Sequence, residues 1–218
     1  MHRPLRITLL LLLAASAATA RADPITSGDF GSFAGWSGSI VDSFTLDLIP
    51  VDPATDPDHF TLIGGGFARL TNDFDFFEVA LFQDFVLPDD TLTIAFDFAW
   101  LLTAGDPFSP DFVQAKLIDP VTRDFLIDLF PLSLNTSAPS ASGTIFEDIS
   151  FLAGQTVSLE FILQDGDFNE NDRFDIGNIV IGTAVVDVAE PETILLFLTG
   201  LAGLLIAGGR GRKREESM

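Results

Sequence analysis

The chain has 218 residues, a formal net charge of −21, 47% hydrophobic residues and no cysteine. The lack of cysteine excludes disulfides, thiol catalysis and thiolate metal sites. The large excess of Asp and Glu repels nucleic acid and anionic lipid and favours cations, so nucleic acid is excluded as a partner.

The first 22 residues have the pattern of a secretory signal peptide. Arg3 and Arg6 precede the apolar run 7–15, and small residues follow through Ala22. This order is typical of a segment that directs export and is then removed. Cleavage is expected after Ala20 or after Ala22, and a permanent N-terminal anchor is the alternative.

Residues 23–188 are expected to form one domain, which is long enough to bury a sizeable core. Between residues 23 and 190 only four basic residues stand against 29 acidic ones, a net charge of −25. Solubility or adaptation to salt would explain this charge. The alternative is bound Ca²⁺, a hard cation that takes oxygen ligands.

The elements predicted in this domain are short strands. A Gly- and Ser-rich start is expected to lie across the core, with Trp36 as a core residue or, alternatively, a sugar-stacking platform. Large apolar residues at every second position over 91–102 predict a long strand with Trp100 in the core. Glycines 64–66 predict a bulge or a turn between two strands. The predicted strands are residues 40–49, 60–70, 78–87, 91–102, 112–118, 124–130, 144–150, 156–163 and 173–188, with a long loop over 131–142.

Turns recur about every dozen residues and no stretch of the domain has a 3.6-residue period, which is typical of a β-sandwich. The pieces FVLPDDTLTIAFDFAW, DFVQAKLID, DISFLAGQTVSLEFIL and FDIGNIVIG resemble the galactose-binding-like jelly rolls of exported bacterial proteins. The resemblance implies an all-β, jelly-roll-like antiparallel β-sandwich. That group often ends on Asp-Asn-Val, where this chain has Gly177-Asn178-Ile179, so its usual calcium site is not carried over.

An acidic loop near the end of the domain is a candidate cation site. Its start, Asp165-x-Asp167-x-Asn169, is that of an EF-hand loop, but Glu170 stands where glycine belongs and Ile176 where the bidentate Glu belongs. An irregular Ca²⁺ loop and a solvated acidic turn remain as alternatives. The candidate calcium ligands are Asp165, Asp167, Asn169, Asp172 and Asp175.

Enzyme signatures are sparse. The only histidine of the domain is His59, in an acidic loop, and no phosphate-binding glycine loop or zinc spacing occurs. We therefore expect a non-catalytic surface or matrix protein that binds glycan or calcium, with loop aromatics such as Phe108 and Phe168 as stacking contacts. The alternative is a secreted carbohydrate-active enzyme that uses a pair of carboxylates.

The segment 189–214 has three parts in order. The first is the short motif Glu190, Pro191, Glu192 and Thr193, and the second is the uncharged run 194–209. As a helix this run would span about 24 Å, slightly short of the ~30 Å hydrocarbon core, so Thr193 and some bilayer thinning would contribute. A basic stop-transfer cluster follows and is expected in the cytoplasm with residues 215–218. Its members are Arg210, Arg212, Lys213 and Arg214.

This order of parts resembles the PEP-CTERM sorting signal of Gram-negative bacteria. Glu190 and Pro191 match the second and third positions of the motif, and Ala189 stands where the first proline is usual. The resemblance implies cleavage by an exosortase, a membrane cysteine protease. It also implies a precursor anchored in the inner membrane, then delivery to the cell surface or the extracellular polysaccharide.

Overall fold

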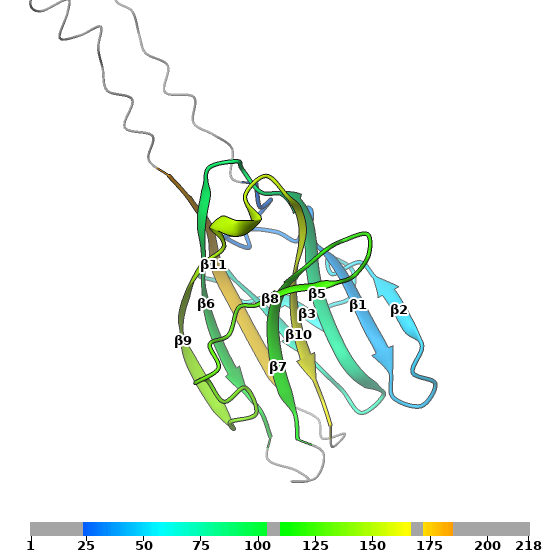
Figure 1. Ribbon diagram of the computed structural model, residues 1–218. Helices are drawn as coiled ribbons and strands as arrows, with labels where there is room; N and C mark the ends of the chain where they lie inside the picture. Colours follow the sequence, from blue (N-terminus) through cyan, green and yellow to red (C-terminus); the bar gives the residue numbers. More distant parts are fainter. Residues whose placement is uncertain (1–23, 104–109, 167–171, 185–218) are drawn as a thin grey trace, which may run out of the picture. The chain divides into compact units, whose positions relative to one another are not determined.

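The computed structural model describes residues 24–103, 110–166 and 172–184. Within these ranges, eleven strands form two antiparallel sheets that pack face to face (Figure 1). This confirms the prediction of an all-β antiparallel sandwich. The one helical element there is a short 3-10 helix, η1 (Ser150–Leu152), and no helix in the same ranges is long and apolar enough to cross a membrane. The expected signal peptide 1–22 and membrane helix 194–209 lie outside them.

Sheet A has six strands in the order β2-β1-β5-β10-β7-β8, and sheet B has five in the order β3-β4-β11-β6-β9. Strands far apart in the chain are therefore neighbours, as β5 is of β10. The strands of sheet A are β1 (Ser37–Asp42), β2 (Leu48–Val51), β5 (Phe76–Val86), β7 (Phe112–Ile118), β8 (Phe125–Asp128) and β10 (Thr156–Gln164). Those of sheet B are β3 (Phe60–Leu62), β4 (Phe67–Thr71), β6 (Thr91–Leu101), β9 (Ser140–Asp148) and β11 (Arg173–Thr183).

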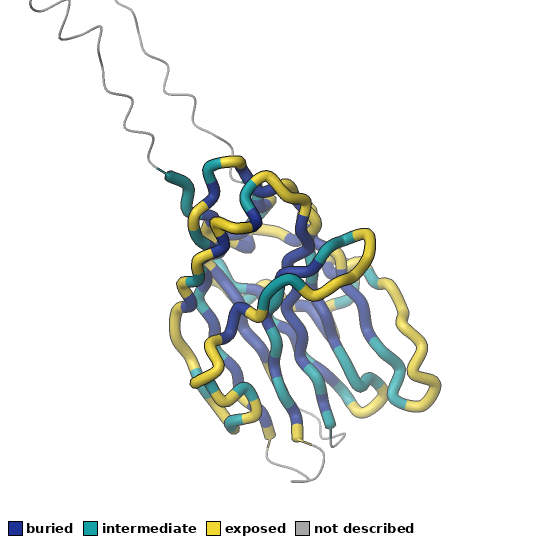
Figure 2. The backbone as a smooth tube through the Cα atoms, viewed as in Figure 1, coloured by how far each residue is buried: buried dark blue, intermediate teal, exposed yellow. Residues whose placement is uncertain are grey.

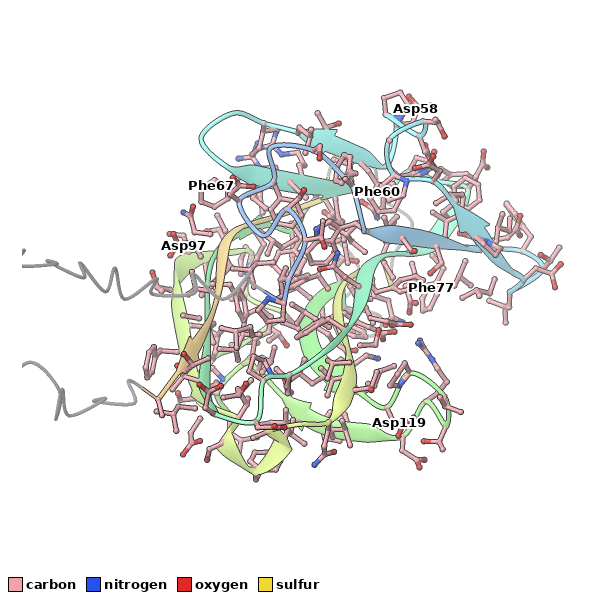
Figure 3. All side chains as sticks on the ribbon, turned by 90° about the horizontal axis from the view of Figure 1, so that it is seen from above. Asp58, Phe60, Phe67, Phe77, Asp97 and Asp119 are labelled. Atoms are coloured by element: carbon pink, nitrogen blue, oxygen red, sulfur yellow. The ribbon has the colours of Figure 1, made fainter. Side chains whose placement is uncertain are left out.

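The core between the sheets is built from alternate residues of each strand, and the tube in Figure 2 alternates in burial along the strands accordingly. Aromatic rings fill its centre. Phe161 of β10 lies 5.2 Å from Phe96 of β6 and 6.1 Å from Phe174 of β11, measured between ring centroids. In Figure 3 the buried Phe60 lies inside the molecule, and Asp58, Asp97 and Asp119 lie at its periphery.

The segment before β1 also belongs to the core. Trp36 is buried, and its ring lies 6.2 Å from that of Phe161. Two hydrogen bonds fix the start of the segment, from the Thr26 amide to Gln83 Oε1 (2.9 Å) and from Gln83 Nε2 to the Thr26 carbonyl (3.3 Å). The core assignment of Trp36 is confirmed, as is that of Trp100, and the alternative of a sugar-stacking Trp36 is wrong.

One predicted strand is wrong: residues 40–49 are the two halves of a hairpin. β1 ends at Asp42 because its carboxylate accepts hydrogen bonds from the Phe44 and Thr45 amides (2.8 and 2.7 Å), which bends the chain into a turn. Leu46 in this turn has a left-handed φ of 59°. The alternation of residues 40–49 is therefore that of two antiparallel strands, β1 and β2.

Two other boundaries are settled by backbone conformation and pairing. Glycines 64–66 all have positive φ and form the turn between β3 and β4, so the alternative of two strands is correct there. The loop predicted over 131–142 is shorter than expected, because Ser140 already pairs with Leu101 at the start of β9.

Candidate ligand-binding face and cation site

The outer face of sheet A carries side chains that do not belong to the core. On β10 the odd-numbered residues from Val157 to Leu163 are core residues, so the even-numbered ones point to the opposite side. Ala80 of β5 and Ile162 of β10 confirm this, since both are buried yet neither belongs to the core cluster.

The register of the strands arranges this outer face in three rows across the sheet. The first row is Phe82, Glu160, Lys116 and Asp128. The second is Ser39, Ala80, Ile162 and Gln114, and the third is Val41, Glu78, Gln164 and Phe112. Three members of the middle row are buried, and most members of the other two are partly exposed. The face therefore has a small, mostly buried centre between two more exposed rows that carry most of its charged and aromatic side chains.

Glu160 is the fixed charge of this face. Its side chain is only 4% exposed, and Arg123 Nη2 donates a short hydrogen bond to its Oε1. Lys116 Nζ lies 3.5 Å from its Oε2. These are two of the four basic residues between positions 23 and 190. Because a buried carboxylate without a partner is strongly destabilising, these two cations hold Glu160 in place.

The turn between β7 and β8 brings Arg123 to Glu160. The Asp119 carboxylate accepts hydrogen bonds from the Thr122 and Val121 amides (2.9 and 2.8 Å), and these bonds lower the pKa of Asp119. Arg123 follows with a left-handed φ of 63°. The aspartate-capped turn therefore returns the chain over the sheet, with the guanidinium above β10.

Glu78 is a second carboxyl on the same face. Burial raises its pKa, the nearby charge of Lys116 opposes that shift, and the charge of Glu160 adds to it. The two carboxyls therefore have different environments. Glu160 contacts two cations, whereas burial is the main influence on the pKa of Glu78.

Three other carboxylates meet at one end of the sandwich. Asp111 precedes β7, Asp165 follows β10 and Asp172 precedes β11, and all three are buried with carboxylate oxygens within 4.8 Å of one another. Two backbone amides orient the cluster, from Thr103 to Asp172 Oδ1 (2.6 Å) and from Gly166 to Asp111 Oδ1 (2.9 Å). This donor set of hard oxygens suits Ca²⁺.

The structure brings together two of the five calcium ligands expected from the sequence, Asp165 and Asp172. Asp175 points elsewhere, since Arg69 Nε and Nη2 donate to its two oxygens at 2.7 and 2.8 Å. Asp167 and Asn169 lie outside the described residues. The sequence reasoning missed Asp111, which is distant in the chain, and the only signal for it was a position directly before a strand.

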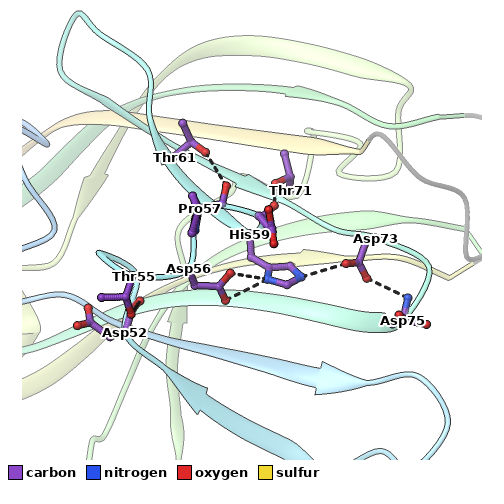
Figure 4. Close-up of polar contacts among 10 residues, drawn as sticks. Asp52, Thr55, Asp56, Pro57, His59, Thr61, Thr71, Asp73 and Asp75 are labelled. Atoms are coloured by element: carbon purple, nitrogen blue, oxygen red, sulfur yellow. Dashed lines mark hydrogen bonds and ion pairs between the residues drawn. The ribbon is translucent and has the colours of Figure 1, made fainter.

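His59 joins two acidic loops (Figure 4). The ring is buried, with Nδ1 3.0 Å from both oxygens of Asp56 and Nε2 3.5 Å from Asp73 Oδ2. The ring of Phe76 packs against it edge to face, with centroids 5.0 Å apart. These contacts tie the loop before β3 to the loop before β5, which is a structural role.

A shallow hollow of about 390 Å³ lies between the segment 25–29 and residues 178–180 of β11. Asn178 has a left-handed φ of 53°, and its amide donates to Asp97 Oδ2 at 2.7 Å. The Thr144 hydroxyl donates to the other Asp97 oxygen. Both hydrogen bonds lower the pKa of Asp97, and the bond from Thr144 has the larger effect. The Asn178 amide that lines this hollow is therefore already engaged by Asp97.

The remaining predicted site residues lie outside the described ranges. They are the loop aromatics Phe108 and Phe168, the sorting motif 190–193 and the basic cluster 210–214.

No family model and no curated protein matches the chain. Among solved structures, TmCBM61 in complex with β-1,4-galactotriose aligns over 75% of this chain and 100% of its own, at 13% identity and a TM-score of 0.43. A CBM4 structure aligns over 73% and 99%, at 13% identity and a TM-score of 0.39. The enzymatically active domain of bacteriophage CBA120 tailspike protein 4 aligns over 74% of this chain and 21% of its own, at 9% identity and a TM-score of 0.41. At these TM-scores the likenesses carry no argument about ligand or activity.

We predict that Glu78→Gln stabilises the protein at neutral pH and has no effect in acid. The folded pKa is raised above the ordinary value of 4.5, so the unfolded chain releases this proton at lower pH than the folded one. Wild-type stability therefore falls as pH rises through that window, whereas glutamine does not ionise. Thermal melts of both full-length proteins in mild detergent between pH 3 and pH 8 measure this. A melting difference that stays constant over that range would contradict it.

Proposed function

We propose that the chain is an exported, non-catalytic surface or matrix protein whose jelly-roll-like domain binds glycan on the outer face of sheet A. The observation that carries this proposal is the three-row arrangement on β5, β10 and β7. The side-chain amides of Gln114 and Gln164 on this face each offer two donors and an acceptor in one plane. This suits the hydroxyls around the edge of a sugar ring. Phe82 and Phe112 offer aromatic surface for the apolar face of such a ring.

The charge of the domain restricts the glycan. A domain of net charge −25 repels polyanions at long range, and the two cations of this face are already engaged by Glu160. A neutral polysaccharide is therefore the ligand class that fits.

A second candidate function is favoured by the two carboxyls of this face. A carboxyl whose pKa is raised by burial, next to one held by cations, is the pattern from which glycosidases build an acid and its partner. Polymer cleavage that Glu78→Gln abolishes would support this alternative.

We expect neutral polysaccharides to bind this face, and affinity electrophoresis of the full-length protein in gels containing xylan, galactan, hydroxyethyl cellulose or dextran measures this. The double variant Gln114→Ala/Gln164→Ala removes polar groups from the second and third rows. It should weaken binding to the retained polymer by about tenfold or more, because truncating central contacts commonly has that effect.

The matched control is Gln155→Ala, a loop glutamine directly before β10 that lies outside the face. It should bind as the wild type does. The bound polymer should also keep its length after prolonged incubation. Equal binding by the double variant and the wild type, or retention by none of these polymers, would overturn the proposed face.

We further propose that the termini sort the protein. The signal peptide 1–22 would direct export, and the run 194–209 would hold the precursor in the inner membrane with Arg210, Arg212, Lys213 and Arg214 in the cytoplasm. An exosortase would then cut near Glu190 to Thr193 and release the domain to the surface. The support is the order of the three parts of the tail, with Ala189 replacing the usual first proline.

Expression in a Gram-negative host that carries an exosortase, followed by cell fractionation and mass spectrometry of the termini, tests the sorting. We expect a domain outside the inner membrane that has lost both ends. Truncation before Ala189 should abolish the membrane-bound precursor. Full-length protein that is soluble inside cells and still carries its first twenty residues would refute this route.

We also propose that Asp111, Asp165 and Asp172 bind one Ca²⁺ that stabilises the sandwich. The support is geometric, because three like charges buried within 4.8 Å of one another repel, and a divalent cation removes that repulsion. The role is structural, since the ion would join the ends of three strands.

Calcium should raise the melting temperature of the full-length protein. For a dissociation constant near 10 μM, 1 mM Ca²⁺ adds about 2.7 kcal/mol, or roughly 5–10 °C for a domain of this size. Asp111→Asn and Asp172→Asn should abolish the shift. The matched control is Asp175→Asn, which breaks the pair with Arg69 and lowers stability but should keep the calcium response. An unchanged melting temperature at millimolar Ca²⁺ would end this proposal.

A further inference from the structure

An exposed apolar patch covers the tip of the β1–β2 hairpin and the loop beside it. Phe44, Leu46 and Leu48 are 74%, 69% and 63% exposed, and Phe74 is 53% exposed. The rings of Phe44 and Phe74 lie 6.3 Å apart, and the Ser43 amide donates to the Asp75 carbonyl at 2.9 Å. The two loops therefore present one continuous surface, which we call the hairpin-tip patch.

Carboxylates surround this patch. Asp42 and Asp47 flank the hairpin turn, and Asp73 and Asp75 flank Phe74. Hydrogen bonds from the Thr45 and Phe44 amides lower the pKa of Asp42, which keeps it ionised. Between β1 and β5 the one Lys or Arg is Arg69, which pairs with Asp175, and the one histidine is His59, which is buried beside Asp73. An apolar centre with a charged rim is the composition of a protein interface.

The proline in β2 and the carboxylate rim disfavour three kinds of partner. Strand addition to the edge strand β2 is disfavoured because Pro50, in its middle, has no amide hydrogen to donate. A second copy of the chain would bring two acidic rims together. Anionic lipid would be repelled by the same carboxylates.

We infer that the hairpin-tip patch docks a protein partner that presents apolar side chains among lysines and arginines. The aliphatic residues Leu46 and Leu48 favour a polypeptide over a polysaccharide, because a sugar ring carries hydroxyls where they need apolar contact. Phe44 is the most exposed residue of the patch and lies against a second ring, the position of an interface hot spot. The carboxylate rim selects the sign of the partner's charge and speeds the encounter.

The test uses three fluorescent 14-residue peptides titrated with the full-length protein in mild detergent: one of Leu and Lys, one of Ser and Lys with the same charge, and one of Leu and Glu. The Leu/Lys peptide should bind at least about tenfold more tightly than the other two. Phe44→Ser/Leu46→Ser should lose about tenfold in affinity for it, as hot-spot truncation does. Its matched control is Phe146→Ser, an equally exposed phenylalanine on β9.

Equal affinity of the wild type and Phe44→Ser/Leu46→Ser would overturn the inference, as would equal binding of the Ser/Lys peptide. Binding of chitosan oligosaccharides or of phosphatidylglycerol vesicles that depends on Phe44 and Leu46 would also overturn it, in favour of a glycan or a membrane. Gln114→Ala/Gln164→Ala should leave peptide binding unchanged, so failure of the glycan face and failure of this patch are separable.

Discussion

The alternation of side chains along β10 is the constraint on which the rest of the structure depends. Phe161 of sheet A packs against the rings of Phe96 and Phe174 in sheet B, and its neighbours Glu160 and Ile162 face the opposite side of sheet A. A slip of one residue would place a carboxylate in the core and a phenylalanine on the surface. The aromatic core therefore fixes the register, and the register fixes the outer rows that form the candidate binding face.

The acidic residues have several distinct roles in the fold. Some aspartates shape turns, as Asp42 and Asp119 do by accepting backbone amides. Others pair with the scarce cations, as Asp175 does with Arg69. The cluster of Asp111, Asp165 and Asp172 differs from these two groups of aspartates, because it brings like charges together in a buried place. Much of the charge is thus structural, which composition alone did not reveal.

The sequence predicted the sandwich class and most strands, because period-two alternation is retained in the folded strand, as the burial of Ile94, Phe96, Phe98 and Trp100 shows. It predicted one strand over 40–49 because a hairpin keeps the same alternation, and only the hydrogen bonds of Asp42 show the turn. For the cation site it found Asp165 and Asp172, which are close in sequence, and missed Asp111, whose proximity comes from the pairing of β7 with β10. The outer rows of sheet A could not be predicted from the sequence either, because each row combines residues of separate strands.

The carboxylate cluster also lies where the ends of the two sheets meet. Asp111 and Asp165 belong to the ends of strands in sheet A, whereas Asp172 begins a strand of sheet B. A cation bound among them would connect the ends of two layers that otherwise meet through the apolar core. Under the calcium proposal, the calcium concentration of the surroundings would then set how firmly the ends of the two layers are joined.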